Sequence, residues 1–456
     1  MRTRPRSIFP AVIRLILLLA GICYFAPEGA AGQANIAQCL RPHVGSGNPC
    51  SRPGPFTLRD PEPTLNLGAG NPVNLATGNK FQEAVDVPLQ GDGLLFVRSY
   101  NAMDPTDTGL GPGWRHSFDI ALRRNHDGLH ITQADGSRIP FRPRKGKTAQ
   151  AIDPAHGRLQ VVPAGWVWRW PNGNSLAFDR DGRISALSVD GRHLQVQRYH
   201  RASIFADHIR TVTSRDGRVM VFHYRQDPQD RIRLVRIQTP TGSVQYNYDP
   251  VGARLSTVLA DNGSQTHYLY EPAYQQGRPW QLTGLAVSVS DAQATAQPLL
   301  RLRTWQYDRE GRVSRALRHD LPVGPGTLLF HYLPGSGDGR KGKTRVVDAD
   351  GHSTTFDWRQ WQGRYLLESV TGFGCVDCPA PGMRASYDDK GRLATINGLR
   401  LDRYASGAPA HLSLPRGFWP GLQLQYDPAG RLISWSSGLT GIQHIDYNNL
   451  GQPVSQ

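Results

Sequence analysis

The sequence predicts an all-β protein built from tandem β-hairpins, and two observations lead to that prediction. Gly and Pro are abundant, at 49 and 34 of 456 residues, and the long Ala, Leu, Glu and Lys stretches of helical proteins are absent. From about residue 70 onward, segments of alternating apolar and polar residues are separated by Asp-Gly and Asn-Gly turns. Each segment has about the usual length of a strand, roughly five to eight residues. We therefore expect little helix.

The first 32 residues differ from the rest of the chain. Arg2, Arg4 and Arg6 precede an apolar run, and small residues follow it. This pattern predicts a secretory signal peptide over residues 1–32. An uncleaved membrane anchor is the alternative, but Arg14 interrupts the run, which is also short for a full span. We expect an exported protein of the periplasm, the cell surface or the exterior, without a stable membrane span after cleavage.

Four cysteines remain after the predicted cleavage. Cys39 and Cys50 lie in residues 33–69, a Pro- and Gly-rich leader expected to be extended, while Cys375 and Cys378 lie in "GCVDCPAP". An oxidising compartment favours disulfides, and of the three possible pairings Cys39–Cys50 with Cys375–Cys378 needs the fewest assumptions. A redox Cys-x-x-Cys site is the alternative, but such a site uses a helix N-terminus and the neighbours here predict a loop. No metal site or cofactor is expected.

The formal net charge is +15, which raises the question of nucleic-acid binding. The arginines, however, are scattered through Gly-Arg turns along the whole chain, without a basic tail or a stripe on one helix face. Solvated turn arginines with a general attraction to anionic surfaces are the favoured interpretation. We therefore expect no nucleic-acid partner.

One phrase recurs along the chain: Tyr-Asp, two variable residues, then Gly-Arg-Leu. Its aromatic, acidic and Gly positions are Phe178, Asp179, Gly182, Tyr248, Asp249, Gly252, Tyr307, Asp308, Gly311, Tyr387, Asp388, Gly391, Tyr426, Asp427 and Gly430, and a weaker copy begins at Tyr447. The spacings between successive copies are 70, 59, 80, 39 and 21 residues. A period near 20 residues, with intervening copies eroded, predicts a repeat architecture in which one unit is about one hairpin.

The phrase has the chemistry of a hairpin corner. In the copy at Tyr387, we expect the ring to lie on the buried face and Asp388 to accept backbone N–H bonds across the turn. Gly391 then supplies the left-handed conformation that closes the turn. Because side chains alternate along a strand, Arg392 and Leu393 are expected on opposite faces, one in solvent and one in the core. Stacked corners extend one sheet and need no catalytic role.

These residues resemble a known family. "YDPVGARL", "YDREGRV", "YDDKGRL" and "YDPAGRL" look like the YD repeats of rearrangement-hotspot (RHS) proteins, and residues 70–123, from "NPVNLATGNK" to "GPGWRHSFD", are similar to the domain that precedes such repeats. The resemblance implies an RHS-type N-terminal β domain at 70–123 and a repeat region at 124–456. It also implies a large curved antiparallel sheet or a partial cocoon-like shell, of the kind that encloses toxins in bacterial competition. No self-cleavage core or toxin domain is recognised in this sequence.

The first functional hypothesis is therefore an exported, non-enzymatic shell or scaffold of a contact-dependent competition or polymorphic toxin system. Its partner would be another protein, either an effector or a completing RHS chain. The alternative is a cell-surface or envelope module for carbohydrate binding or adhesion. Its candidate binding residues are Trp166, Trp168, Trp170, Trp358 and Trp361. An alternating tryptophan row is, however, more often part of a core than a sugar platform.

An enzyme is not expected. His116, Ser117 and Asp119 would alternate between the two faces of a strand and would not converge. Asp348 and Asp350 in "VVDADGH" are explained as turn aspartates, and this segment lacks the loop length and closing Glu of a common calcium site.

Overall fold

The computed structural model describes most of residues 67–447, together with the strand residues 38–39, 64–65 and 453–455. Within 67–447, the residues outside the description are 70–71, 90–92, 126–127, 145–147, 153–155, 171–172, 190, 251–253, 289–297, 322–325, 334, 336–339, 362–363, 376–377, 380, 405–408, 414–420, 428–431 and 438–440. The predicted signal peptide, most of the leader, Cys50, Gly252 and Gly430 therefore lie outside the described residues.

The all-β prediction is confirmed, and the dominant feature is one strip of 29 strands, β8 to β36, each antiparallel to the next. The first third comprises β8 (Ala121–Asn125), β9 (Gly128–Thr132), β10 (Arg138–Arg144), β11 (Thr148–Ala151), β12 (Arg158–Val162), β13 (Gly165–Arg169), β14 (Ser175–Phe178), β15 (Ile184–Val189), β16 (Arg192–Arg198) and β17 (Ile209–Ser214). The middle comprises β18 (Val219–Gln226), β19 (Ile232–Thr239), β20 (Gly242–Tyr248), β21 (Leu255–Ala260), β22 (Gln265–Leu269), β23 (Gly284–Ser288), β24 (Leu299–Tyr307), β25 (Val313–Arg318) and β26 (Thr327–Leu333).

The last third comprises β27 (Lys341–Asp348), β28 (Ser353–Trp361), β29 (Arg364–Gly372), β30 (Met383–Tyr387), β31 (Leu393–Ile396), β32 (Leu399–Arg403), β33 (Pro409–Ser413), β34 (Leu422–Tyr426), β35 (Leu432–Ser437) and β36 (Gly441–His444). The 3-10 turn η2 (Pro272–Tyr274) lies in the β22–β23 connection. Two short pairs at the beginning and the end of the described residues lie outside the strip: β1 (Gln38–Cys39) with β2 (Thr64–Leu65), and β37 (Asp446–Tyr447) with β38 (Pro453–Ser455).

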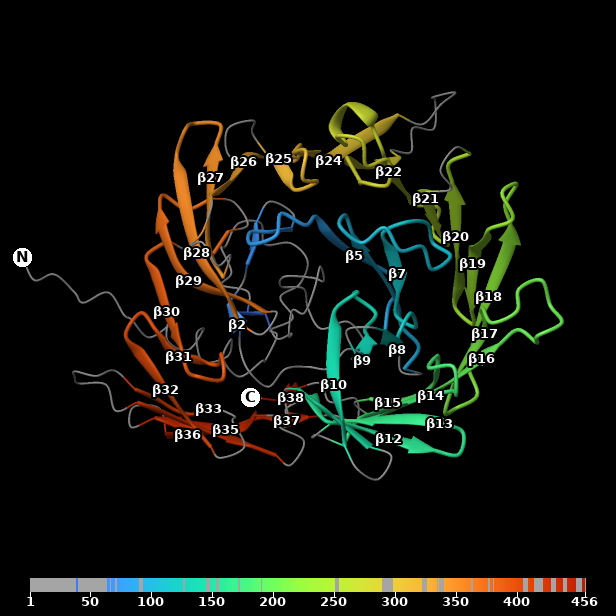
Figure 1. Ribbon diagram of the computed structural model, residues 1–456, viewed down its shortest axis with the longest axis horizontal. Coiled ribbons are helices and arrows are strands. Elements are labelled where there is room, and N and C mark those ends of the chain that lie inside the picture. Colours follow the sequence, from blue (N-terminus) through green and yellow to red (C-terminus); the bar gives the residue numbers. More distant parts are fainter. Residues whose placement is uncertain are drawn as a thin grey trace, which may run out of the picture.

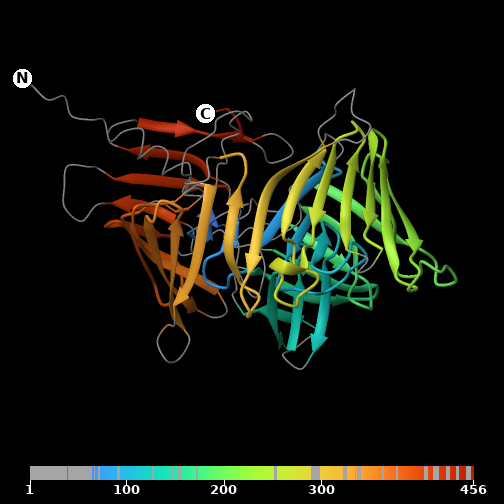
Figure 2. The ribbon, with the colours of Figure 1, turned by 90° about the horizontal axis from the view of Figure 1, so that it is seen from above.

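The strip curves around an inner segment formed by residues before β8. This segment contains β3 (Gly68–Ala69) paired with β4 (Val73–Asn74), and a three-stranded sheet of β5 (Phe81–Val87), β6 (Phe96–Asn101) and β7 (Trp114–His116). Figure 1 shows β5 and β7 inside the ring of strip strands, and Figure 2 shows them behind the yellow strands from a second direction. Every residue of β6 is buried, so this central strand lies in the core, whereas β5 has an exposed position at Val85.

The strip is an open sheet, and its beginning is fastened to one of its own corners. Ala121 of β8 forms a bridge with Arg183, and the Leu122 N–H donates to the Gly182 carbonyl at 2.8 Å. Among the described residues no register joins β8 to β36, the last strand of the strip. The sheet therefore turns back on itself near the Phe178 corner without closing over its full width.

One continuous core joins the inner segment to the concave face of the strip. Phe96 of β6 lies 5.9 Å from the ring of Phe222 on β18, and Trp114 of β7 lies 4.8 Å from Tyr268 on β22, both in edge-on contact. Such pairs bury large apolar areas and add specific ring geometry. The inner segment and the strip thus form one packed unit.

Candidate functional site

The corner at Asp388 shows how the repeated phrase folds. The Asp388 carboxylate accepts hydrogen bonds from the backbone N–H groups of Lys390 and Arg392, both at 2.9 Å, and from Arg392 Nε at 2.7 Å. Gly391 has a φ of +72°, which disfavours any side chain, and Leu393 begins the next strand in the core. Burial acts to raise the pKa of Asp388, but the hydrogen bonds from Arg392 and Lys390 outweigh it and lower the pKa.

The same bonds recur at the predicted corners. Asp179 and Asp308 each accept from the backbone N–H of the arginine four residues later, at 2.9 Å, and from its Nε, at 2.8 Å. Asp249 does so with Arg254, five residues later, because this copy has one more residue. At the last strong copy, Tyr426 pairs with Leu432 just as Tyr387 pairs with Leu393. The corner is therefore one local structure used repeatedly.

Two further corners have this hydrogen-bond pattern without the phrase. Asp227 accepts from the backbone N–H of Arg231 at 2.9 Å and from its Nε at 2.7 Å, although Asp230, with a φ of +61°, stands where Gly is usual. Asp348 accepts from the backbone N–H of His352 at 2.9 Å, and His352 replaces the arginine. The Asp348 segment is thus a corner. The turn also explains why other side-chain atoms that could ligate a metal ion lie close to the Asp348 carboxylate.

The eroded copies become visible from the order of the strands. Because hairpin turns alternate between the two edges of an antiparallel strip, the turns that follow even-numbered strands share one edge. Near these turns stand Phe178, Tyr199, Tyr224, Tyr248, Tyr270, Tyr307, Tyr332, Tyr387, Tyr404 and Tyr426. The copies that the phrase does not identify therefore keep the aromatic residue and have lost the Asp or the Gly.

The tyrosine hydroxyl explains why Tyr is favoured over Phe at this edge. Each of several hydroxyls donates to a main-chain carbonyl of a neighbouring hairpin: Tyr307 to Leu282 at 2.7 Å, Tyr332 to Val313 at 2.8 Å, Tyr387 to Leu367 at 2.6 Å and Tyr404 to Leu424 at 2.7 Å. Arginines of adjacent hairpins also stack on these rings, as Arg312 does on Tyr332 at 4.7 Å. These contacts join one hairpin to the next.

A buried polar cluster fixes the inner segment to the middle of the strip. Arg98, 1% exposed, binds both carboxylate oxygens of Asp86, at 2.5 and 2.8 Å, and donates to the Tyr268 hydroxyl at 3.1 Å. Tyr246 donates to Asp86 at 2.8 Å, and the Arg98 guanidinium lies 4.9 Å from the centre of the Trp114 ring. Removing one partner of such an ion pair is expected to cost about 3–5 kcal/mol, because the other charge stays buried.

Lys80 is a second buried cation of the inner segment. Its Nζ donates to the Phe81 carbonyl at 2.5 Å and to the Gln82 side chain at 3.0 Å, and it lies 4.1 Å from the centre of the Trp305 ring of β24. Burial, together with the charge of Arg303, lowers the pKa of Lys80 well below its usual value. This residue therefore also links the inner segment to the strip.

Side chains of the strip bind the main chain of the inner segment. The Tyr248 hydroxyl lies 2.6 Å from the Leu234 carbonyl and 3.1 Å from the Gly109 carbonyl, and Trp280 donates through its indole N–H to the Ala102 carbonyl at 3.0 Å. Thr344 of β27 donates to the carbonyl of Leu75. These bonds recognise peptide groups rather than particular side chains. The concave face of the strip thus binds main-chain groups of the inner segment, at turn and bend residues.

The tryptophans predicted to bind carbohydrate are placed differently from one another. Trp168 and Trp170 are core residues, 0% and 4% exposed, and the Trp168 indole donates to the His156 carbonyl at 2.7 Å. These two rings are therefore not presented to a surface glycan. Trp166 and Trp358 are partly buried against the core, and Trp361 packs beside Gly391. A carbohydrate role of these three stays a prediction.

The positions of His116 and Asp119 differ from the expectation that these residues lie on opposite faces of a strand. The strand ends at His116 and the chain turns, so His116 Nε2 lies 3.3 Å from Asp119 Oδ1 instead of on the opposite face. Ser117 Oγ, by contrast, accepts from the Val97 N–H at 2.7 Å and donates to the Val97 carbonyl. The serine is thus engaged with β6, and these three residues do not form a nucleophile with its base.

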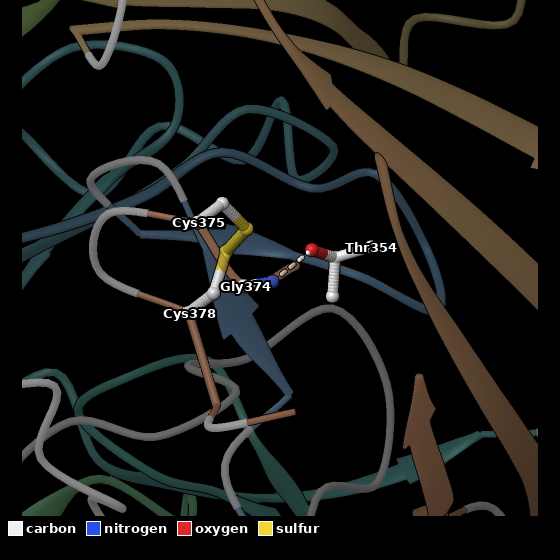
Figure 3. Close-up of a disulfide and its surroundings, with 4 residues drawn as sticks. All are labelled: Thr354, Gly374, Cys375 and Cys378. Atoms are coloured by element: carbon white, nitrogen blue, oxygen red, sulfur yellow. Dashed lines mark hydrogen bonds between the residues drawn. A yellow bond between two sulfur atoms is a disulfide. The ribbon is translucent and has the colours of Figure 1, made fainter. Parts of the chain in front are cut away.

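Cys375 and Cys378 are joined by a disulfide in the loop after β29. Figure 3 shows the neighbouring Gly374 N–H donating to the Thr354 hydroxyl, at 2.8 Å, which ties this loop to β28. The side chain of Cys39 lies outside the described part of the structure, as does Cys50. The predicted pairing of those two stays a prediction.

Comparison with protein families gives one match. Residues 70–141 match the model of a domain of unknown function, DUF6531. The match covers the inner segment from just before β4, with β8, β9 and part of β10, whereas the sequence pattern suggests a boundary at residue 123. No curated protein matches the chain.

Solved structures give distant likenesses. The crystal structure of TcdB2-TccC3-Cdc42 is matched at 14% identity with a TM-score of 0.30, over 82% of this chain and 22% of that chain. The Photorhabdus luminescens Tc holotoxin pore with a TccC3 mutation is matched at 13% identity with a TM-score of 0.31, over 86% of this chain and 22% of that chain. A porin-like protein from Bacteroides uniformis is matched at 10% identity with a TM-score of 0.16, over 63% and 96%.

The chain spans about a fifth of the length of the first two of these proteins. At such TM-scores the likenesses carry no weight for function. Within the described residues, no helix has the length and apolarity needed to cross a membrane.

Proposed function

We propose that this protein is an exported, non-enzymatic shell that holds a second polypeptide, as part of a bacterial competition or toxin system of the RHS kind. The observation that supports the proposal best is the binding of main-chain carbonyls by the concave face of the strip. Trp280 of the β22–β23 connection and Thr344 of β27, far apart along the strip, both donate to backbone oxygens of the inner segment. A surface that binds peptide groups accepts extended polypeptides with little dependence on their sequence.

The repeat chemistry supports the same role. The tyrosine bonds and the corners that carry the repeated phrase lie at one edge of the strip, so hairpins can be added without changing the concave face. The DUF6531 match over residues 70–141, which includes most of the inner segment, supports the proposal that a distinct element precedes the repeats. The RHS resemblance of the repeated phrase supplies the biological setting, and the sequence pattern of residues 1–32 supplies the proposed export.

The test is protection of a partner from proteolysis. A photo-crosslinking residue at Tyr404, which is exposed at the edge with the aromatic corners, is compared with one at Arg345, which is exposed on β27. We expect the Tyr404 position to capture a polypeptide in the native host, and that polypeptide to resist protease until the shell is unfolded in urea. Recovery of the chain alone, or digestion of the captured polypeptide at the rate of its free form, would contradict the proposal.

A further inference from the structure

Strands β8 to β13 present an unusually basic outer face. Residues 121–178 contain nine Lys and Arg but only three Asp and no Glu, and Asp135, one of the three, is buried. Seven arginines of these strands are exposed: Arg123, Arg124, Arg138, Arg142, Arg144, Arg158 and Arg169. In Figure 1, β10, β12 and β13 lie together in the lower part of the ring. This part of the strip thus concentrates positive charge.

These arginines differ from those of the corners. A corner arginine such as Arg312 binds the aspartate four residues before it. The aspartates of this stretch are Asp127, Asp135 and Asp153, and none of them stands four residues before one of the seven arginines. Within the described part of the chain, none of the seven arginine side chains has an ion pair or a hydrogen bond. Their guanidinium groups are available to a ligand.

The register places several of these residues in one row. Arg142 lies opposite Gln150, Gln150 opposite Arg158, and Arg158 opposite Arg169, across β10, β11, β12 and β13. Arg158 and Arg169 are thus a directly opposed pair of like charges, with Cα atoms about 4.5–5.5 Å apart. Such a pair destabilises a sheet. Violations of this kind are expected where a protein surface serves a function.

We propose that this row binds an extended polymer with repeated phosphate groups. Guanidinium groups match phosphate oxygens through paired hydrogen bonds, and a row across four strands, roughly 14 Å long at the usual strand spacing, suits a linear ligand. The tryptophans of this region point to the opposite face of β13, since Trp166 and Trp168 alternate with Arg169. The row therefore offers neither rings for stacking nucleic-acid bases nor apolar side chains for entering a bilayer.

Binding of long-chain inorganic polyphosphate to the full chain at physiological salt tests the proposal. We expect the variant with Arg158→Gln and Arg169→Gln to bind about 30-fold more weakly, since each basic residue near an anionic surface contributes about 1 kcal/mol. Its Tm should equal or exceed that of the unmodified protein, because a repulsive pair is removed. The matched control is Arg210→Gln with Arg345→Gln, two exposed arginines elsewhere on the strip, which removes the same charge.

Each outcome of this binding experiment tests the arginine row independently of the proposed shell function. A loss of polyphosphate affinity in the Arg158 and Arg169 variant, with the affinity of the control unchanged, supports binding by the row. Equal losses in both variants would assign binding to net charge alone, and unchanged affinity in both would exclude the row. Tighter binding to anionic phospholipid vesicles or to single-stranded DNA than to polyphosphate would overturn the choice of ligand.

Discussion

Replacing Gly182 with alanine tests whether a repeat corner fastens the beginning of the strip. Gly182 has a φ of +77°, and a Cβ at this position would lie 2.3 Å from the carbonyl oxygen of Leu122. Because that oxygen belongs to the main chain of β8, it cannot rotate away, and the strand must move. The movement would break the hydrogen bond from the Leu122 N–H to the Gly182 carbonyl.

Two contributions set the magnitude. The left-handed conformation costs an alanine about 1–2 kcal/mol. Loss of a buried hydrogen bond adds about 1 kcal/mol, and more if its groups stay unpaired. We therefore expect Gly182→Ala to lower the free energy of unfolding by about 2–4 kcal/mol. Gly351 is the matched control, since its φ is +83° but a Cβ there would meet nothing within 4 Å. Gly351→Ala should cost only the conformational part, about 1–2 kcal/mol.

Urea unfolding followed by tryptophan fluorescence measures both variants, and amide hydrogen exchange at Leu122 reports the local contact. We expect exchange at Leu122 to accelerate in Gly182→Ala and to stay unchanged in Gly351→Ala. Equal destabilisation by the two substitutions, with Leu122 equally protected, would refute the conclusion that this corner holds β8.

Three further predictions use the same unfolding assay. Tyr307→Phe should lower the free energy of unfolding by about 1–2 kcal/mol, because it removes a buried hydrogen bond; Tyr365→Phe, whose hydroxyl has no partner among the described residues, should cost less than about 0.5 kcal/mol. Burial would raise the pKa of Asp227, but hydrogen bonds from its own turn lower it to about 2. Because this value lies below that of an unfolded Asp, about 3.9, the stabilisation by Asp227 is present above pH 4 and is lost as the pH falls towards 2. Asp227→Asn should therefore make the urea midpoint of unfolding depend less on pH across that window. Replacing Cys375 and Cys378 with alanine should cost about 2 kcal/mol, as expected for a loop this short, and a reductant should then have no further effect.

Different results would contradict each of these. Equal losses in the two tyrosine variants would mean that the hydroxyl bond adds nothing to the corner. An Asp227→Asn protein with the full acid sensitivity of the unmodified chain would assign that sensitivity to other carboxylates. A cysteine variant as stable as the oxidised protein would show that the disulfide does not constrain the unfolded chain.

The corners were predictable because their bonds are local. Asp388 finds its donors within four residues, and Gly391 is required by one backbone angle. The phrase therefore indicates the turn wherever Asp and Gly are both kept. It fails at Asp227, because Asp230 also adopts a positive φ and the aromatic residue, Tyr224, stands three positions before the Asp instead of one.

The inner contacts were not predictable in the same way. Arg98 stands in an alternating strand and gives no sign that it binds Asp86 beneath Tyr246, which lies far along the chain. Nor does the segment around His116 reveal that the strand ends there and turns Asp119 back towards the ring. Tyr246 and Tyr268 lie more than a hundred residues from Asp86 and Arg98, and partners at that separation leave no spacing pattern in one sequence.

By itself, the sequence determined that this protein is made of repeated antiparallel hairpins, since each corner depends on turn residues and on alternation over a few positions. Tertiary structure alone decided that the strip curves around residues 67–120, that Trp168 is core, and that Arg158 opposes Arg169. The physical reason is that curvature, burial and register result from packing summed over many strands, which no single hairpin specifies.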